Sequence, residues 1–260
     1  MAVQGTAVAA GPPAGVGEGS CCPVVELRQY RLRPRARDTL VEIFERAALD
    51  GQEAVGMEVV GQFRDLDDPD RFVFVRGFPG MAERAAALRA FYDDGPVWAA
   101  IRDEANATMA AWDDVRLLRP AFPGSGFAPG GEQPTPGAAD APAGLVVATV
   151  YPLAEPADDG FAAFFAGELA PALAASGADI LATFATEPSP NTYPLLPVRE
   201  GEEVFVWFGR FADRAAYDRH VAALAGSRGW QEGLAAELAR FLEAPPEVRL
   251  MAPTPRSRLR

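Results

Sequence analysis

The sequence carries one order of motifs twice, and this internal repeat constrains the fold more than any other feature. Apolar stretches at 24–34 and 146–156 open the two copies, and each runs into a proline. Later positions then match at a constant offset: Gly56, Phe63 and Pro69 in the first copy, Gly177, Phe184 and Pro190 in the second. A tryptophan follows in the last helical stretch of each copy, at Trp98 and Trp230. The chain therefore contains two related units.

Each copy alternates strand-like and helix-like stretches in the order β-α-β-β-α-β, which is typical of a ferredoxin-like domain. Such a domain has both helices on one face of its sheet, so the other face needs a partner if it is apolar. We assign the large apolar groups of the third strands, such as Phe72, Phe74 and Trp207, to that open face. The sequence thus predicts an α+β fold in which two tandem ferredoxin-like domains pack sheet to sheet around a shared barrel-like space.

A stretch rich in proline and glycine separates the two copies and sets the predicted domain boundaries. The prediction comprises a disordered tail (1–22), a first ferredoxin-like domain (23–119), a linker (120–144), a second ferredoxin-like domain (145–252) and a C-terminal tail (253–260). We expect the linker to be mobile and the C-terminal tail to fray, because neither shows hydrophobic periodicity.

The charge balance argues against several classes of protein. The chain has 24 basic and 36 acidic residues and a net charge of −12, which disfavours nucleic-acid binding. It contains no lysine, which excludes a Schiff base or a P-loop lysine, and a single histidine, which excludes a multi-histidine metal site. No apolar run is long enough for a transmembrane helix, and no signal peptide is recognisable. We expect a cytoplasmic monomer or homodimer that does not insert into membranes.

Polar side chains on the first three strands indicate a candidate site. Strand alternation places Glu26, Arg28 and Tyr30 on one face of the first strand, and we expect Val25 and Leu27 to face the helices. By the same alternation three further residues share the face of the polar set: Gln62, Arg64 and Arg76. The second copy has small, uncharged residues at the corresponding places, which we identify as Ala148, Val150, Thr183, Ala185 and Gly209.

This pattern predicts a ligand site between the two sheets. Arg28, Gln62, Arg64 and Arg76 would bind a small organic anion, Phe74 and Trp207 would form walls, and Glu26 and Tyr30 would be the candidate proton carriers. Glu26 could carry a proton only if burial raised its pKa. The alternative is that these charges form a structural ion pair or lie at a solvated sheet edge.

Three motifs in the first copy resemble the NIPSNAP family: 24–34, 59–79 and 90–109. The resemblance is specific over about 24–120 and loose in the second copy. It implies the dimeric α+β barrel superfamily, whose members include cofactor-free monooxygenases, cyclases, isomerases and haem-dependent enzymes. Bacterial relatives often have a histidine shortly after the GPVW motif, where this chain has Ile101.

Three functions remain open. The first is a small-molecule binder, or an enzyme of specialised metabolism that needs no metal or cofactor. The second is a noncatalytic NIPSNAP-like module that binds other proteins. The third is a haem-binding enzyme, because haem enzymes of this superfamily use a helical histidine and His220 lies in a predicted helix. We expect His220 to be a packing or surface residue, and Cys21 and Cys22 to be unpaired thiols.

Overall fold

The computed structural model describes residues 21–128, 134–137 and 144–260. Nearly all of the predicted disordered tail lies outside this part of the chain, and so do 129–133 and 138–143 of the predicted linker. Within the described ranges, no helix is both long enough and apolar enough to cross a lipid bilayer.

Both halves have the predicted order β-α-β-β-α-β. The first half consists of β1 (Val24–Leu32), α1 (Arg37–Ile43), the π-helical turn η1 (Phe44–Ala48), α2 (Leu49–Glu53), β2 (Glu58–Asp65), β3 (Arg71–Phe78), α3 (Met81–Tyr92), α4 (Pro96–Thr108) and β4 (Met109–Pro120). The second half consists of β5 (Leu145–Pro152), α5 (Phe161–Phe164), η2 (Phe165–Leu169), α6 (Ala170–Ala175), β6 (Asp179–Thr186), β7 (Val204–Phe211), α7 (Arg214–Gly226), η3 (Trp230–Leu234), α8 (Ala235–Phe241) and β8 (Glu247–Pro253).

Local signals in the sequence explain where several helices begin and end. Gly56 and Gly177 follow the first helical segment of each half with φ angles of 89° and 110°, a left-handed backbone that favours glycine. This requirement explains why the glycine recurs in both copies. Pro96 occupies the first turn of α4, where a missing N–H costs nothing, and the Asp213 carboxylate accepts a hydrogen bond from Ala216 N at the start of α7.

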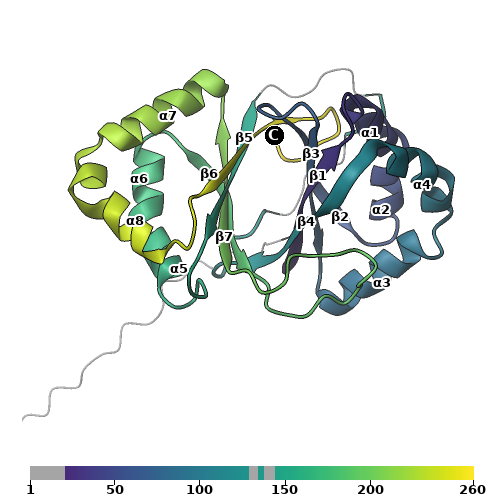
Figure 1. Cartoon of the computed structure of the whole chain (residues 1–260), viewed down its shortest axis with the longest axis horizontal. Helices are drawn as coiled ribbons and strands as arrows, with labels where there is room; N and C mark the ends of the chain where they lie inside the picture. Colours follow the sequence, from purple (N-terminus) through teal and green to yellow (C-terminus); the bar gives the residue numbers. More distant parts are fainter. Residues whose placement is uncertain (1–20, 129–133, 138–143) are drawn as a thin grey trace, which may run out of the picture.

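The two four-stranded sheets join into one closed barrel with the strand order β1-β3-β2-β8-β5-β7-β6-β4. The halves meet where β2 pairs with β8 and where β4 pairs with β6, both antiparallel. The helices of each half cover the outer face of its own sheet, on opposite sides of the molecule (Figure 1). The prediction of two ferredoxin-like halves packed sheet to sheet is therefore confirmed.

Apolar side chains fill the space between the two sheets, which corrects the predicted direction of the strand faces. Val25 and Leu27 point into the barrel, where they are buried with Val73, Val75 and residues of the second sheet such as Phe208. The prediction that Val25 and Leu27 face the helices is wrong. The apolar faces of the two sheets bury each other, so the face with the charged residues is left to the helices.

The predicted linker is packed against the barrel where the structure describes its beginning. Phe127 is buried between Phe184 and Phe208, with ring centroids 4.9 and 5.0 Å away. Ser125 donates a hydrogen bond to the carbonyl oxygen of Thr183 at 2.9 Å. These contacts fix the chain as it leaves β4.

The C-terminal segment is also packed rather than frayed, contrary to our expectation. The amides of Thr254 and Leu259 donate hydrogen bonds to the carbonyl oxygens of Gln62 and Val60 in β2, both at 2.9 Å. Arg256 is buried and its guanidinium binds both oxygens of the Asp50 carboxylate. The segment thus fastens α2 and β2 to the end of β8.

Cys21 and Cys22 are joined in a disulfide, so the expectation of two unpaired thiols is wrong. The pair stands just before β1, and Cys22 packs against Gly77 of β3, where a Cβ would lie 2.2 Å from the Cys22 sulfur.

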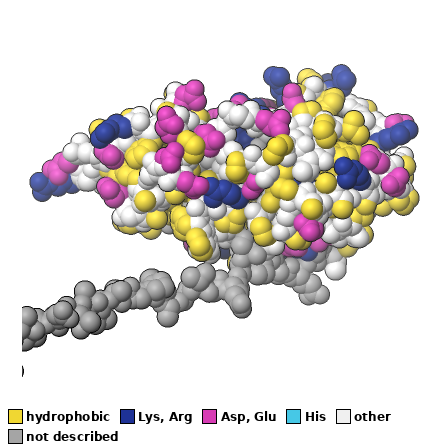
Figure 2. All heavy atoms as spheres, turned by 90° about the horizontal axis from the view of Figure 1, so that it is seen from below, with side chains coloured by type: hydrophobic (Ala, Val, Ile, Leu, Met, Phe, Trp, Pro, Cys, Tyr) yellow, Lys and Arg dark blue, Asp and Glu magenta, His cyan; other side chains and the backbone are white. Residues whose placement is uncertain are grey.

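Over the surface seen in Figure 2, acidic, basic and apolar side chains are interspersed.

The packing of Phe127 generates a first prediction. Phe127→Ala should lower the free energy of unfolding by about 3–5 kcal/mol, because it leaves a cavity in the barrel. The control is Phe122→Ala, five residues earlier and 37% exposed, which should change it by less than about 0.5 kcal/mol. Urea unfolding of the three proteins measures both changes. Equal, small effects would show that the described start of the linker does not belong to the barrel core.

Candidate functional site

The polar residues predicted from the sequence lie on the helix-facing side of the first half's sheet. In the register of β1 and β3, Glu26 stands opposite Arg76 and Arg28 opposite Phe74. Gln62 and Arg64 of β2 share this face and reach helix residues, because Gln62 donates to Glu45 and Arg64 to Asp38. The six side chains therefore share one face, as the alternation predicts, but that face meets the helices and not the second sheet.

A buried charge cluster occupies the centre of this face. The Glu26 carboxylate accepts hydrogen bonds from Arg28 Nη1 at 2.9 Å, from Arg76 Nε at 2.7 Å and from Arg84 Nε at 2.6 Å. All four side chains have no exposed surface. Three guanidinium groups thus face one carboxylate, and the cluster has an excess of two positive charges.

The electrostatics of the cluster remove Glu26 from the candidate proton carriers. Burial acts to raise the pKa of Glu26, but the charges of Arg76, Arg28 and Arg84 outweigh it and hold this pKa well below its ordinary value of 4.5. The carboxylate is therefore ionised at any physiological pH. Its role is to hold the three arginines in place.

Two tyrosines and a glutamine connect the cluster to the space beneath the helices. Arg28 Nε donates to Tyr30 Oη at 3.0 Å, and Arg76 Nη1 donates to Tyr92 Oη at 3.2 Å and to Gln52 Oε1 at 2.8 Å. Both phenol oxygens are acceptors in these bonds, so each hydroxyl proton is free to be donated elsewhere. Burial raises the pKa of Tyr30, which keeps its phenol protonated at neutral pH.

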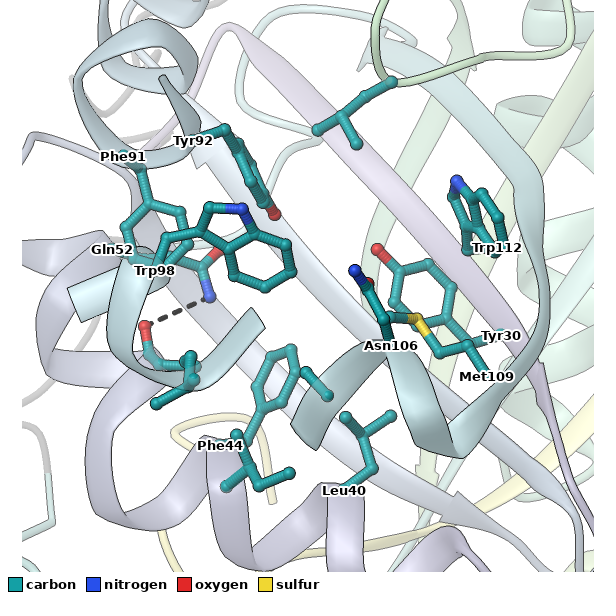
Figure 3. Close-up of a pocket in the computed structure, with 15 residues that line it drawn as sticks. Tyr30, Leu40, Phe44, Gln52, Phe91, Tyr92, Trp98, Asn106, Met109 and Trp112 are labelled. Atoms are coloured by element: carbon teal, nitrogen blue, oxygen red, sulfur yellow. Dashed lines mark hydrogen bonds between the residues drawn. The ribbon is translucent and has the colours of Figure 1, made fainter. Parts of the chain in front are cut away.

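The same three side chains line a cavity between the sheet and the helices, in which the centre of a water molecule can occupy about 70 Å³. Figure 3 shows the Trp98 ring projecting into it and the Tyr30 hydroxyl and the Asn106 amide turned toward its centre. The walls come from β1, α1, η1, α2, α3, α4, β4 and one residue of the second half: Tyr30, Leu40, Ile43, Phe44, Ala48, Gln52, Phe91, Tyr92, Trp98, Ile101, Ala105, Asn106, Met109, Trp112 and Leu196. The cavity therefore combines an aromatic lining with a few hydrogen-bonding groups.

Residues 25–122 match the model of the NIPSNAP family. The first half of this chain is thus similar to a NIPSNAP domain, and we refer to this half as the NIPSNAP domain. Among curated proteins, no sequence matches the chain. The match ends where β4 gives way to the linker, so it covers the half that contains the charge cluster and nearly all of the cavity wall.

Solved structures with the same fold extend over both halves. A candidate monooxygenase from Lactobacillus acidophilus NCFM is 14% identical, with a TM-score of 0.53 over 89% of this chain and 94% of that chain. A second candidate monooxygenase, from Fusobacterium nucleatum, is 9% identical, with a TM-score of 0.54 over 90% and 93%. An anthrone oxidase-like protein is 12% identical, with a TM-score of 0.55 over 92% and 93%. At these identities the likeness establishes the fold alone.

The two aromatic residues predicted as walls do not meet. Phe74 of the NIPSNAP domain lies beside the rings of Tyr30 and Phe44, at centroid distances of 5.4 and 5.0 Å, in the layer beneath the cavity. Trp207 lies in the second half, where it donates a hydrogen bond to Tyr151 Oη at 3.3 Å. The barrel separates them, because each faces the helices of its own half.

Within residues 144–260, all of which the structure describes, the second half has no counterpart of the charge cluster. Gly209 and Trp207 of β7 correspond to Arg76 and Phe74 of β3. Val147 and Thr149 of β5 pair with Gly209 and Trp207, just as Glu26 and Arg28 of β1 pair with Arg76 and Phe74. Val147 and Thr149 therefore correspond to Glu26 and Arg28. Our assignment of Ala148 and Val150 to these places is one residue out of register. Gly209 takes the place of Arg76, and a Cβ there would lie 2.5 Å from the Trp207 ring. The indole thus occupies space that a guanidinium fills in the NIPSNAP domain.

His220 is a packing residue in this structure. It is buried on α7, its Nδ1 is 2.9 Å from Ser176 Oγ, and its ring packs 5.1 Å from the ring of Phe211. Burial lowers the pKa of His220, which favours the neutral imidazole. A haem ligated here would have to displace the surrounding aromatic rings.

The sequence reasoning did not find four groups that complete the site: Gln52, Arg84, Tyr92 and Leu196. Arg84 lies in the alanine-rich helix α3, where the sequence suggests a solvent-exposed charge. In the structure it is buried against Glu26. The sequence carried no signal for Arg84, because an excess of arginines over carboxylates on the strands predicts an acidic partner from the helices and not a third guanidinium.

The charge cluster generates a second prediction. Glu26→Gln should lower the free energy of unfolding by about 3–5 kcal/mol at pH 7, because it leaves three buried guanidinium groups without a counter-charge. The pKa of Glu26 is lower in the folded protein than its ordinary 4.5, so its contribution is complete above that value and declines as the pH falls below it. The gap between wild type and variant should therefore narrow in acid.

Urea unfolding between pH 7 and pH 3 measures this gap. Glu104→Gln is the control, since the half-exposed Glu104 pairs with the half-exposed Arg46 and its loss should leave stability unchanged. A Glu26→Gln protein as stable as wild type would contradict the assignment of Glu26 as the anchor of the cluster.

Proposed function

We propose that the NIPSNAP domain binds a small, planar, aromatic compound in its anionic form within the cavity between sheet and helices. The observation that carries the proposal is the position of an aromatic cavity directly above a buried cluster with two excess positive charges. The predicted ligand chemistry is retained, but the proposed place is this cavity and not the space between the sheets, which apolar side chains fill.

Charge supports an anionic ligand. A buried charge without a counter-charge is costly. The residues bonded to the cluster supply no carboxylate or phenolate besides Glu26 to balance its excess positive charge. An anion in the cavity would lie next to Tyr30 and Tyr92, which already accept hydrogen bonds from Arg28 and Arg76. Their free hydroxyl protons can be donated to the ligand, so the positive potential of the arginines reaches it through the two phenols.

The walls support a planar aromatic body. Trp98 and Trp112 line the cavity together with Phe44, Phe91 and Met109. Trp98 lies in contact with the Tyr92 ring, at a centroid distance of 5.0 Å, so one side of the cavity is a continuous aromatic surface. Aromatic rings pack favourably against such a surface in stacked or edge-to-face arrangements.

The reaction we propose is oxidation by dioxygen without a cofactor, a chemistry that fits both this site and the names of the structurally similar proteins. In an anthrone, loss of a proton from the ring CH₂ gives an anion whose charge lies largely on oxygen, and a positive cavity favours that form. The anion and O₂ form a peroxide at the former CH₂ carbon, this peroxide takes back from solvent the proton that the CH₂ lost to it, and loss of one water leaves a carbonyl. Tyr30 and Tyr92 would hold the anionic oxygen during this step.

Binding of 1-naphthoate tests the ligand class. The wild-type protein should bind 1-naphthoate at least about tenfold more tightly than the neutral 1-naphthamide of nearly the same shape, because only the former carries charge. Tyr30→Phe should weaken binding of the naphthoate about tenfold through loss of one hydrogen bond to an anion.

Isothermal titration calorimetry measures these affinities. The control is Tyr151→Phe, which removes the hydroxyl at the corresponding position of the second half and should leave binding unchanged. Equal affinity for the naphthoate and the amide would contradict an anionic ligand, and no binding of either would contradict the cavity as a ligand site.

Oxygen consumption tests the reaction separately. Wild-type protein supplied with anthrone in air-saturated buffer should consume one O₂ per anthraquinone formed, several-fold faster than buffer alone. Tyr30→Phe should slow this reaction, whereas Tyr151→Phe should not. Naphthoate binding without oxygen uptake would indicate a binding protein that does not catalyse this oxidation, in line with the noncatalytic alternative.

A further inference from the structure

We propose that the loop between β6 and β7 in the second half determines which ligands fit the cavity of the NIPSNAP domain, and that Leu196 is its specificity-determining residue. This inference rests on the proposed function, because it concerns the ligand size that the same cavity accepts. It assigns the second half a part in recognition, although that half has no charge cluster of its own.

The length of the loop is the first observation. Five residues, 66–70, connect β2 to β3 in the first half, whereas seventeen residues, 187–203, connect β6 to β7 at the corresponding place of the second half. Figure 1 shows the longer loop, in green, crossing from the second half to lie along α3 of the first. Long ordered loops in a compact protein commonly serve a functional purpose.

The contacts of the loop with the NIPSNAP domain are specific. Arg84 donates from Nη1 to Asn191 Oδ1 at 3.0 Å and to Thr192 Oγ1 at 3.2 Å. Tyr193 donates from its hydroxyl to Asp93 at 2.5 Å and stacks on the ring of Tyr92, at a centroid distance of 6.3 Å. The loop is therefore fixed both to the buried charge cluster and to a tyrosine of the cavity.

These contacts position Leu196 at the cavity wall. The Asn191 amide donates to the carbonyl oxygen of Leu196 at 2.9 Å, so the residue that accepts from Arg84 also holds the backbone of Leu196. Among the described residues that line the cavity, Leu196 alone comes from the second half. Its neighbour Leu195 is 74% exposed and points away. The loop thus contributes one apolar side chain to the cavity, on a rigid support.

The size of that side chain should set how far an aromatic ligand can extend. Leu196→Ala would lengthen the cavity without changing the charge cluster, and Leu196→Trp would shorten it. Leu195→Ala is the matched control, because it makes the same substitution one position away on the exposed side of the loop. Thermal unfolding of each variant establishes that the fold is retained.

Carboxylates of two, three and four fused rings measure the effect: 1-naphthoate, 9-anthracenecarboxylate and 1-pyrenecarboxylate. Leu196→Ala should improve binding of the pyrenecarboxylate at least about tenfold relative to wild type and change naphthoate binding less than about twofold. Leu196→Trp should abolish binding of the two larger compounds and retain naphthoate. Leu195→Ala should match wild type throughout.

Two negative results have different meanings. In the first, the wild type binds naphthoate, and Leu196→Ala, Leu196→Trp and Leu195→Ala all show the same relative affinities for the three carboxylates as the wild type. That result would overturn the role of Leu196 and leave the proposed function standing. Failure of the wild type and of every variant to bind any of the three carboxylates would overturn the proposed function and this inference with it.

Discussion

The Glu26 carboxylate is the interaction on which the first half depends. Three guanidinium groups converge on it from β1, β3 and α3, and none of the four side chains has exposed surface. Removal of one partner from such a buried group lowers the stability of the fold by more than the ion pairs contribute to it, because a charge is left buried and unpaired. The cluster therefore fixes the relative positions of two strands and a helix. The outer atoms of the same arginines then hold Tyr30, Tyr92, Gln52 and Asn191. One carboxylate thus organises the floor of the cavity and the loop that closes it.

The two halves use their helix-facing layers differently, although their backbones repeat. In the NIPSNAP domain the layer contains charges, phenols and open volume. In the second half it contains Phe161, Phe165 and Phe205, whose rings pack against one another, and Trp207, whose ring lies 6.5 Å from that of His220. Gly209, at the position that corresponds to Arg76, leaves room for the Trp207 indole, because a Cβ there would lie 2.5 Å from the Trp207 ring. The second half is in this respect a support, which holds the barrel together and supplies the β6–β7 loop.

The repeat made the architecture predictable from the sequence. Glycine and phenylalanine positions matched in both copies, and the glycines proved to be left-handed helix ends with a backbone reason to recur. The set of polar residues on one strand face was predictable too, because alternation in a strand follows from geometry alone. The sequence did not predict which face of β1 packs against the helices, because both faces contain groups that can be buried. Val25 and Leu27 lie on one face, and Glu26 and Arg28 lie on the other. Only the partners decide, and these come from distant parts of the chain, as Arg84 does.

Covalent fusion of the two halves has a consequence for how such a site can change over time. In a symmetric dimer of single domains, every substitution appears in both subunits, so an insertion that helps one active site also alters its twin. Here the long connection 187–203 exists once, and its short counterpart 66–70 is unaffected by it. Because the two halves lie on one chain, each can diverge independently, so that one side of the barrel can change while the other stays the same.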